Sequence, residues 1–333
     1  LRSAFLGDVL ARILTAAGHD VIRANYPGDI GLHVIKWLWN YQKHHKGEKP
    51  EKDNTRWMGM IYAEANKRLE ENPELEKEVR ETYVLWDKRD PELVNAWQET
   101  RQWSLDGFKE MYDLLDIHFD RYYFNSMFEQ PGKLMVEELI EKGIAQDERP
   151  DGGAVIVKID EKLNLNEEKY RVMVVLRSDG TALYATEDLA LARQKFIEYP
   201  KLTRSYYVVD VRQSLHFQQV FKTLELAGYE WAVNCQHVPY EIVNLPGNVV
   251  MASREGTGVR LEDLIREATT RALEVVEQKN PDLTNEAKME IARAVGMGAI
   301  RYPMISRESN KVVTFDWETA LDFNGQAAPY IQY

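Results

Sequence analysis

A tyrosine and an aspartate four positions apart, Tyr184 and Asp188, are the residues of this sequence best suited to bind a cation. Residues 171–177 are strand-like, residues 178–181 have the composition of a tight turn, and a helix is expected to begin near Thr186 as its N-cap. The phenol would then end an extended segment, one turn before the carboxylate, and both could face one cavity. A guanidinium pairs bidentately with a carboxylate and can lie against an aromatic ring. Taken alone, the pair is also explained by Asp188 answering the helix dipole and Tyr184 packing half-buried.

Length and composition place the chain in the ordinary globular class. Its 333 residues suffice for one large core or for two or three coupled units, and 44% are hydrophobic and 29% charged. No run approaches the roughly 18 apolar residues of a membrane span, and no signal peptide is visible. The single cysteine, Cys235, excludes an internal disulfide and is expected to be a small buried hydrophobe. We therefore predict a cytoplasmic protein without a membrane segment.

The formal net charge of −12 argues against binding nucleic acid through the overall field, although a local basic groove is not excluded. Two adjacent histidines, His44 and His45, lie in residues 43–56, a polar stretch typical of a surface linker. Neighbouring histidines lack the helical or strand spacing that joint metal binding requires, and we predict no bound metal.

The first part of the chain predicts a helix at residues 1–17, which Gly18 ends, and a short buried strand at residues 20–25. A helix followed by a strand is the second half of a βαβ unit, whose first strand we expect upstream of Leu1. Residues 57–119 then predict two or three charged amphipathic helices, at 58–71, 73–101 and 104–115. Pro73 lies in the first turn of its helix, and Ser104 is the expected N-cap of the last one.

The second half alternates strands and helices. We expect a helix at residues 132–142, paired strands at 153–160 and 170–177, a core strand at 205–210, a helix at 214–227, a strand at 237–245, a loop at 246–258, and helices at 261–278 and 285–304. A strand, a helix, a strand, a glycine loop and a helix in succession are typical of a doubly wound parallel sheet.

Five segments, in this order, resemble those of arginyl-tRNA synthetases, the class I ligases that charge tRNA with arginine. They are LRSAFLGDVLARIL, SDGTALYATEDLA, YYVVDVRQSLHFQQVF, MASREG with the helix after it, and TFDWETALDFNGQAAPYIQY. Any one of them is a weak match. Five in the right order, spanning nearly the whole chain, make the resemblance specific.

The resemblance implies roles for individual residues. Tyr184 and Asp188 fall on the positions that hold the substrate guanidinium, and Gln213 on a further amino-acid contact. His216 stands where nucleotides dock in such folds, or is a helix-start histidine satisfied locally. In addition, four residues match a loop beside the family's active site, Asn25, Gly28, Asp29 and Gly31, although a turn with two glycines explains the same residue types.

The segment MASREG resembles the second class I signature loop, which steadies the triphosphate of ATP as charge develops on departing pyrophosphate. The resemblance implies that Met251, Ser253 and Arg254 contact ATP, with support from backbone N–H groups. The sequence departs from the usual pattern at three positions, Val250 for a lysine, Ala252 for a serine and Glu255 for a frequent basic residue. The first signature, His-X-Gly-His, is expected immediately upstream of Leu1, and the anticodon-binding helical bundle after Tyr333.

We therefore expect an α/β fold, a Rossmann-type doubly wound parallel sheet that a helical and β-containing insertion interrupts and a helical linking segment follows. The catalytic domain would occupy residues 1–42 and 171–280, the insertion residues 43–170 and the linking segment residues 281–333. The resemblance implies that the arginine carboxylate attacks the α-phosphate of ATP with Mg²⁺ present, and that the arginyl group then passes to tRNA(Arg). In this family the first step is expected to need bound tRNA. No tightly bound cofactor is implied, and we expect a monomer.

Two other functions stay open. A class I synthetase for another amino acid would share the fold, although the acidic Asp188 opposite Tyr184 favours a cationic substrate. A non-catalytic, synthetase-like tRNA-interaction module would lack the signature histidines, so the residues upstream of Leu1 distinguish it from an enzyme.

Overall fold

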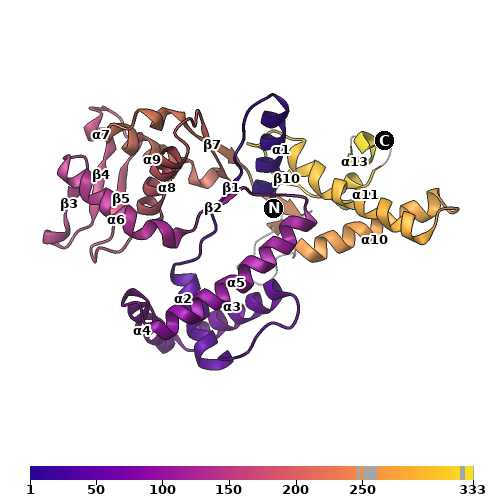
Figure 1. The fold of residues 1–333 in the computed structure, drawn as a ribbon, viewed down its shortest axis with the longest axis horizontal. Helices are drawn as coiled ribbons and strands as arrows, with labels where there is room; N and C mark the ends of the chain where they lie inside the picture. Colours follow the sequence, from indigo (N-terminus) through magenta and orange to yellow (C-terminus); the bar gives the residue numbers. More distant parts are fainter. Residues whose placement is uncertain (246–248, 251–260, 323–326, 333) are drawn as a thin grey trace. The chain divides into compact units, whose positions relative to one another are not determined.

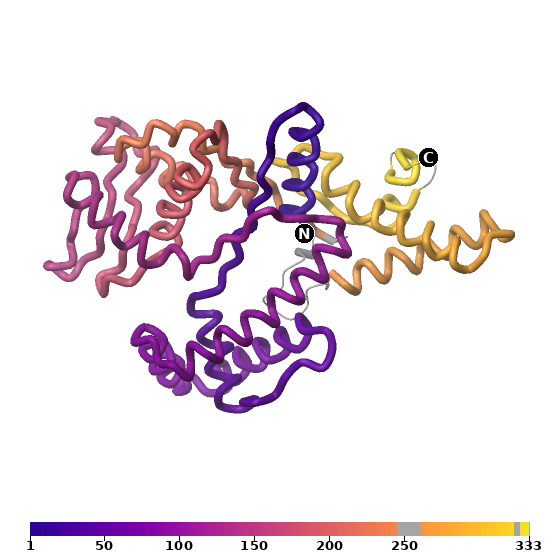
Figure 2. Tube along the Cα trace, in the orientation of Figure 1, coloured from indigo at the N-terminus to yellow at the C-terminus, as the bar shows by residue number. Residues whose placement is uncertain are grey.

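The computed structural model describes residues 1–245, 249–250, 261–322 and 327–332, and the chain forms two compact units (Figure 1). One unit consists of Leu1–Arg23 together with Met127–Tyr333, and the other is Ala24–Ser126. The chain leaves the first unit after Arg23 and returns to it at Met127, as the trace in Figure 2 shows. The division into catalytic-domain parts and insertion stays a prediction.

The second unit, Ala24–Ser126, is mainly helical, and the helices predicted within residues 57–119 lie in it. Its helices are α2 (Leu32–Asn40), η1 (Tyr41–His45), α3 (Asn54–Glu71), η2 (Pro73–Leu75), α4 (Glu76–Asp87) and α5 (Pro91–Leu114). They enclose a core rich in tryptophan, in which Trp37, Trp39, Trp86 and Trp97 are buried.

The boundary between α4 and α5 differs from the prediction. Arg89 has a φ of 56°, and the Asp90 carboxylate accepts from the N–H of Leu93 at 3.0 Å, so that Pro91 starts α5. α5 then continues through Ser104, which is therefore not an N-cap. The pair Asp90-Pro91 is the signal for this break, because proline suits a first helical turn and disfavours helical backbone at the residue before it.

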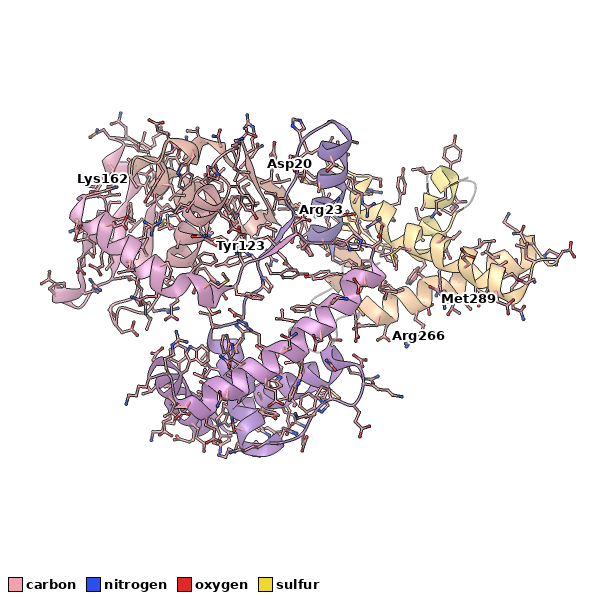
Figure 3. The ribbon with its side chains drawn as sticks, viewed as in Figure 1. Asp20, Arg23, Tyr123, Lys162, Arg266 and Met289 are labelled. Atoms are coloured by element: carbon pink, nitrogen blue, oxygen red, sulfur yellow. The ribbon has the colours of Figure 1, made fainter. Side chains whose placement is uncertain are left out.

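The predicted buried strand at residues 20–25 is also wrong in extent. Only β1 (Ala24–Asn25) is a strand, and it pairs in parallel with β2 (Arg121–Tyr122). Ile22 is 37% exposed. Arg23, labelled in Figure 3, donates to the buried Asp8 carboxylate at 3.1 Å. Side-chain contacts therefore hold this segment, whereas the prediction had backbone pairing in a sheet.

The first unit combines helices with short sheets. Its strands are β3 (Gln146–Asp147), β4 (Val155–Lys158), β5 (Val172–Leu176), β6 (Ser205–Asp210), β7 (Cys235–Tyr240), β8 (Val243–Leu245), β9 (Val249–Val250) and β10 (Val313–Thr314). Its helices are α1 (Arg2–Ala16), α6 (Asn125–Glu141, which begins in the second unit), η3 (Arg149–Asp151), α7 (Ile159–Lys162), α8 (Tyr184–Glu198), η4 (Val211–Gln213), α9 (Ser214–Leu226), η5 (Glu230–Asn234), α10 (Leu261–Lys279), α11 (Asn285–Ile305), α12 (Trp317–Ala320) and α13 (Ala328–Gln332).

Strand pairing confirms the α/β class. β6 and β7 are parallel, with Ser205 opposite Cys235 and α9 between them in the chain, and β4 and β5 are antiparallel, as predicted. The predicted strand at 237–245 is two strands, because the chain turns at Glu241 from pairing with β6 to pairing with β10 and β9. α6 begins at Asn125, earlier than predicted.

One core cluster holds α6, α8 and α9 against β4 and β5. Its fully buried members include Val136 and Leu139 of α6, Val155, Val175, Leu189 of α8 and Leu224 of α9. This cluster anchors α8 through Ala185 and Leu189 and α9 through Val220 and Leu224. Among the helices of the described residues, none is both long and apolar enough to cross a bilayer.

Candidate functional site

A tight turn joins β5 to α8, as predicted. Gly180 has a φ of 79°, and Oδ1 of Asp179 accepts from the backbone N–H of Thr181 at 2.9 Å. The N–H of Arg177 donates to the Thr181 carbonyl at 3.1 Å and closes the turn. Glycine suits the position because it has no Cβ to oppose a positive φ.

α8 begins at Tyr184, and Thr186 lies inside its first turn instead of capping it. The Thr186 hydroxyl accepts from the N–H of Leu183 at 3.0 Å and donates to the carbonyl of Val175 in β5. It therefore anchors the helix start to the strand. As a consequence, Tyr184 and Asp188 are positions i and i+4 of one helix and share a face.

Asp188 is buried, with 9% of its surface exposed, whereas Tyr184 is 63% exposed. Oδ2 of Asp188 lies 2.6 Å from Nε2 of His216 in α9. A carboxylate with little access to water interacts more strongly with a nearby cation than a fully hydrated one does. This face of α8 therefore offers a buried negative charge one turn from an exposed phenol.

The start of α9 contributes Gln213 and His216. Asp210, at the end of β6, accepts from the N–H of Arg212 at 2.9 Å and pairs with its guanidinium, which shapes η4. Gln213 is the exposed residue immediately before α9, and His216 lies in its first turn.

Two titratable side chains near this group were missed by sequence analysis. His237 of β7 packs on Phe217, their ring centroids 5.0 Å apart, and its Nε2 donates to the Val209 carbonyl at 2.9 Å, while burial lowers the pKa of His237. Nζ of Lys195 in α8 lies 3.7 Å from the centre of the Tyr207 ring, and burial lowers the pKa of Lys195 to about 8. A single histidine in a strand and a single lysine in a helix give no signal in one sequence.

Asp29 of the predicted active-site loop lies in the second unit and is 6% exposed. Its Oδ1 accepts from the Ser126 N–H at 2.9 Å, and its Oδ2 accepts from Ser126 Oγ at 2.6 Å and from the Arg101 guanidinium at 2.8 Å. Its carbonyl accepts from the Trp97 indole N–H at 2.7 Å. Asp29 thus joins the loop to α5 and to Ser126 at the start of α6.

The other residues of this loop also make local contacts. Nδ2 of Asn25 donates to the Tyr112 hydroxyl at 3.0 Å. Gly31 has a φ of 120°, which residues with a side chain rarely adopt, and it directly precedes α2. A Cβ on Gly28 would lie 3.5 Å from the amide oxygen of Asn125, an ordinary contact. A role for the loop beside the active site stays a prediction.

Residues 1–317 match the family of class I tRNA synthetases (R), catalytic domain. The chain belongs to this family. The resemblance to arginyl-tRNA synthetases, stated above from five segments, is thereby confirmed.

Relatives of this synthetase chain carry the same assignment. The arginine–tRNA ligase of Bdellovibrio bacteriovorus is 36% identical over 341 residues, which cover 100% of this chain and 57% of that protein. The arginine–tRNA ligase of Clostridium perfringens is 36% identical over 328 residues, covering 98% of this chain and 56% of that protein. The chain therefore spans somewhat more than half the length of these relatives.

A solved synthetase structure agrees. The arginyl-tRNA synthetase of Thermus thermophilus superposes with a TM-score of 0.81 at 28% identity, covering 100% of this chain and 59% of that one. That of Plasmodium falciparum has a TM-score of 0.76 at 20% identity and supports the fold alone.

In this synthetase chain the structure brings two predicted site residues into contact, Asp188 of α8 and His216 of α9. Tyr184 lies one turn before Asp188 in α8, and Gln213 directly precedes α9. Three predicted ATP contacts, Met251, Ser253 and Arg254, lie outside the described residues.

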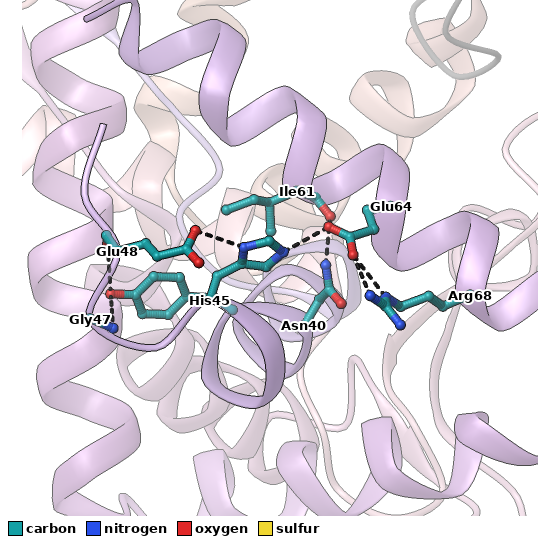
Figure 4. A network of polar contacts seen from close by, with 8 residues as sticks. Asn40, His45, Gly47, Glu48, Ile61, Glu64 and Arg68 are labelled. Atoms are coloured by element: carbon teal, nitrogen blue, oxygen red, sulfur yellow. Dashed lines mark hydrogen bonds and ion pairs between the residues drawn. The ribbon is translucent and has the colours of Figure 1, made fainter. Parts of the chain in front are cut away.

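His45 is part of a polar network in the second unit (Figure 4). Its Nδ1 lies 2.9 Å from Glu48 and its Nε2 lies 2.7 Å from Glu64, which also accepts from Arg68 at 3.0 Å. Burial favours the neutral ring, but the hydrogen bonds to both glutamates outweigh it and raise the pKa of His45. Across the described residues, no group of three or more His, Cys, Asp or Glu side chains is arranged to hold a metal ion.

Proposed function

We propose that the protein activates L-arginine with ATP and transfers the arginyl group to tRNA(Arg). The buried Asp188 carboxylate, one helical turn from the exposed Tyr184 ring, carries the proposal because it suits a planar cation. Relatives named as arginine–tRNA ligases support the same substrate. These relatives are considerably longer than this chain, so the activity is proposed for the full-length protein.

We assign Asp188 to pair with the guanidinium, Tyr184 to lie against its face, and Gln213 to contact the amino acid. A guanidinium held by a carboxylate and a ring is fixed in orientation, which directs the arginine carboxylate toward ATP. On the resemblance alone, Met251, Ser253 and Arg254 are assigned to the triphosphate.

The reaction has two steps. An oxygen of the arginine carboxylate attacks the α-phosphorus of ATP, the bond to the β-phosphate oxygen breaks, and arginyl-adenylate and pyrophosphate result. A hydroxyl of the terminal ribose of tRNA then attacks the arginyl carbonyl and AMP leaves. Mg²⁺ enters with ATP as part of the substrate, and no residue described here is assigned as its ligand.

The test is the arginine dependence of pyrophosphate exchange in the full-length Asp188→Asn variant with cognate tRNA. We expect the KM for arginine to rise at least about tenfold, because a bond between charged groups becomes one to a neutral amide. Glu286→Gln, an exposed first-turn substitution in α11, is the control. An unchanged KM for arginine in Asp188→Asn, or equal use of lysine or glutamine by the wild type, refutes the arginine site.

We also propose that the protein is a cytoplasmic monomer. The single cysteine, which is buried, fits a reducing compartment. Light scattering after size-exclusion chromatography of the full-length protein tests the monomer, and a mass of twice the chain contradicts it.

A further inference from the structure

The contact between Asp188 and His216 links two residues that the sequence assigned to different substrates. Oδ2 of Asp188 and Nε2 of His216 are 2.6 Å apart, and the side chains are only 12% and 22% exposed. An ionised carboxylate only accepts hydrogen bonds, so Nε2 of the histidine carries the donated proton. Each carboxylate oxygen accepts two such bonds, so this contact leaves positions on both oxygens for a ligand.

The imidazole of His216 is itself held by aromatic packing. Its ring meets the Phe217 ring edge-on, with centroids 5.2 Å apart, and Phe217 packs on His237. His237 is tied to the Val209 carbonyl at 2.9 Å. The parallel pair β6 and β7 and the first turn of α9 therefore fix the position of the imidazole.

We propose that His216 is a positioning residue for substrate recognition: it holds the plane of the Asp188 carboxylate in the orientation that a guanidinium requires. This inference rests on the proposed arginine site. A guanidinium needs a carboxylate in its own plane to form two parallel bonds, whereas an ammonium is a point charge that tolerates rotation of the carboxylate. Fixing the plane therefore favours arginine over lysine.

This role differs from the direct ATP contact that the position of His216 in the chain suggested. A histidine that contacts ATP affects the KM for ATP. A histidine that holds Asp188 affects the KM for arginine and the preference for arginine over lysine. A purely structural histidine changes stability without changing that preference.

Three variants of the full-length protein separate these roles. In His216→Gln the amide nitrogen can occupy the place of Nε2 and donate to Asp188. In His216→Asn the side chain is too short to bring its amide nitrogen there, and His216→Leu has no side-chain donor. Pyrophosphate exchange with cognate tRNA is measured against arginine, lysine and ATP, and thermal unfolding is measured in parallel.

We expect His216→Asn and His216→Leu to raise the KM for arginine about tenfold and to lower the arginine preference by a similar factor, the cost of a charge-assisted hydrogen bond. The KM for ATP stays within about twofold, and His216→Gln restores most of the arginine preference. In the double variant of Asp188→Asn and His216→Leu, the further effect of His216→Leu on the KM for arginine largely disappears, because the effects of substitutions at residues in contact are not additive.

Other outcomes overturn the inference. A raised KM for ATP with an unchanged KM for arginine assigns His216 to the nucleotide. Equal behaviour of the glutamine and asparagine variants rejects the positioning role even where the leucine variant does not fold. If Asp188→Asn raises the KM for arginine while His216→Asn keeps wild-type values, the positioning role alone is rejected. If the KM for arginine is also unchanged in Asp188→Asn, the arginine site is rejected as well.

Discussion

Gly132 of α6 lies directly against the backbone of Thr186 in the first turn of α8. A Cβ atom on Gly132 would lie 2.5 Å from the Thr186 carbonyl oxygen and 2.9 Å from its carbonyl carbon. Thr186 in turn holds the N–H of Leu183 and the carbonyl of Val175. The absence of a side chain at Gly132 therefore allows α6 to support the turn that carries Tyr184 and Asp188.

Replacing Gly132 with alanine should lower the free energy of unfolding by about 1–3 kcal/mol, because either helix must move to admit the methyl group. We also expect a higher KM for arginine in the full-length protein. Gly59→Ala in α3 is the matched control, since a Cβ there meets no atom within 4 Å and alanine favours a helix by about 0.5–1 kcal/mol. Equal stability changes in both variants would contradict the close packing at Gly132.

Tyr184→Ala should raise the KM for arginine between about threefold and thirtyfold, the range expected for loss of a ring against a cation. Because Tyr184 is exposed, its removal should change the free energy of unfolding by less than about 0.5 kcal/mol. Tyr184→Phe keeps the ring and should retain a near wild-type KM. A phenylalanine variant as defective as the alanine variant would show that the hydroxyl, and not the ring face, binds the substrate.

Asp29→Ala should destabilise the protein by about 3 kcal/mol, because it leaves the Arg101 guanidinium and the Ser126 N–H without their buried acceptor. Asp29→Asn keeps one acceptor oxygen and should cost less. Denaturant unfolding measures both. Wild-type stability of Asp29→Ala together with lost pyrophosphate exchange would contradict this structural role and support the predicted place of Asp29 in a loop beside the active site.

His45 should make the second unit more stable at acidic than at alkaline pH. Its folded-state pKa is raised above the ordinary 6.5, so its contribution is complete below that value and is lost as pH rises through the folded-state pKa. The side chain is partly exposed, which limits the effect to about 0.5 kcal/mol. Hydrogen exchange of residues 41–64 measured from pH 5.5 to 8.5 should show this loss in the wild type and not in His45→Gln. His118→Gln, at an exposed histidine of the same unit, is the control, and a loss unaffected by His45→Gln would exclude His45 as its source.

Lys195 should have the opposite effect at alkaline pH. Burial lowers its folded-state pKa to about 8 from the ordinary 10.5, so between these values the unfolded chain holds the proton and the folded chain does not. The free energy of unfolding therefore gains a contribution that rises with pH across this window. Subtracting the denaturant-unfolding profile of Lys195→Met from that of the wild type isolates this rise. The same substitution at the exposed Lys67 is the control, and a flat difference for Lys195→Met would contradict the burial of its amine.

Much of the fold follows from local patterns in the sequence. The bounds of α1, α9, α10 and α11 lie within two residues of the prediction, because apolar side chains recur at helical spacing and glycine follows α1 and α9. The pairing of β4 with β5 follows from strand composition on both sides of one polar connection. The break before α5 was also present in the sequence, in Asp90 and Pro91, but was outweighed by a helical pattern on both sides.

The sequence by itself determined the family and the residue types of the candidate arginine site, because motif order and local spacing are properties of the chain. Only the tertiary structure decided how those residues act on one another. Thr186 has the side chain of an N-cap, yet its hydroxyl donates to Val175, and Asp188 meets a histidine 28 positions away. Such contacts depend on how α8 and α9 pack on their strands, and the burial that strengthens them exists only once the core has formed.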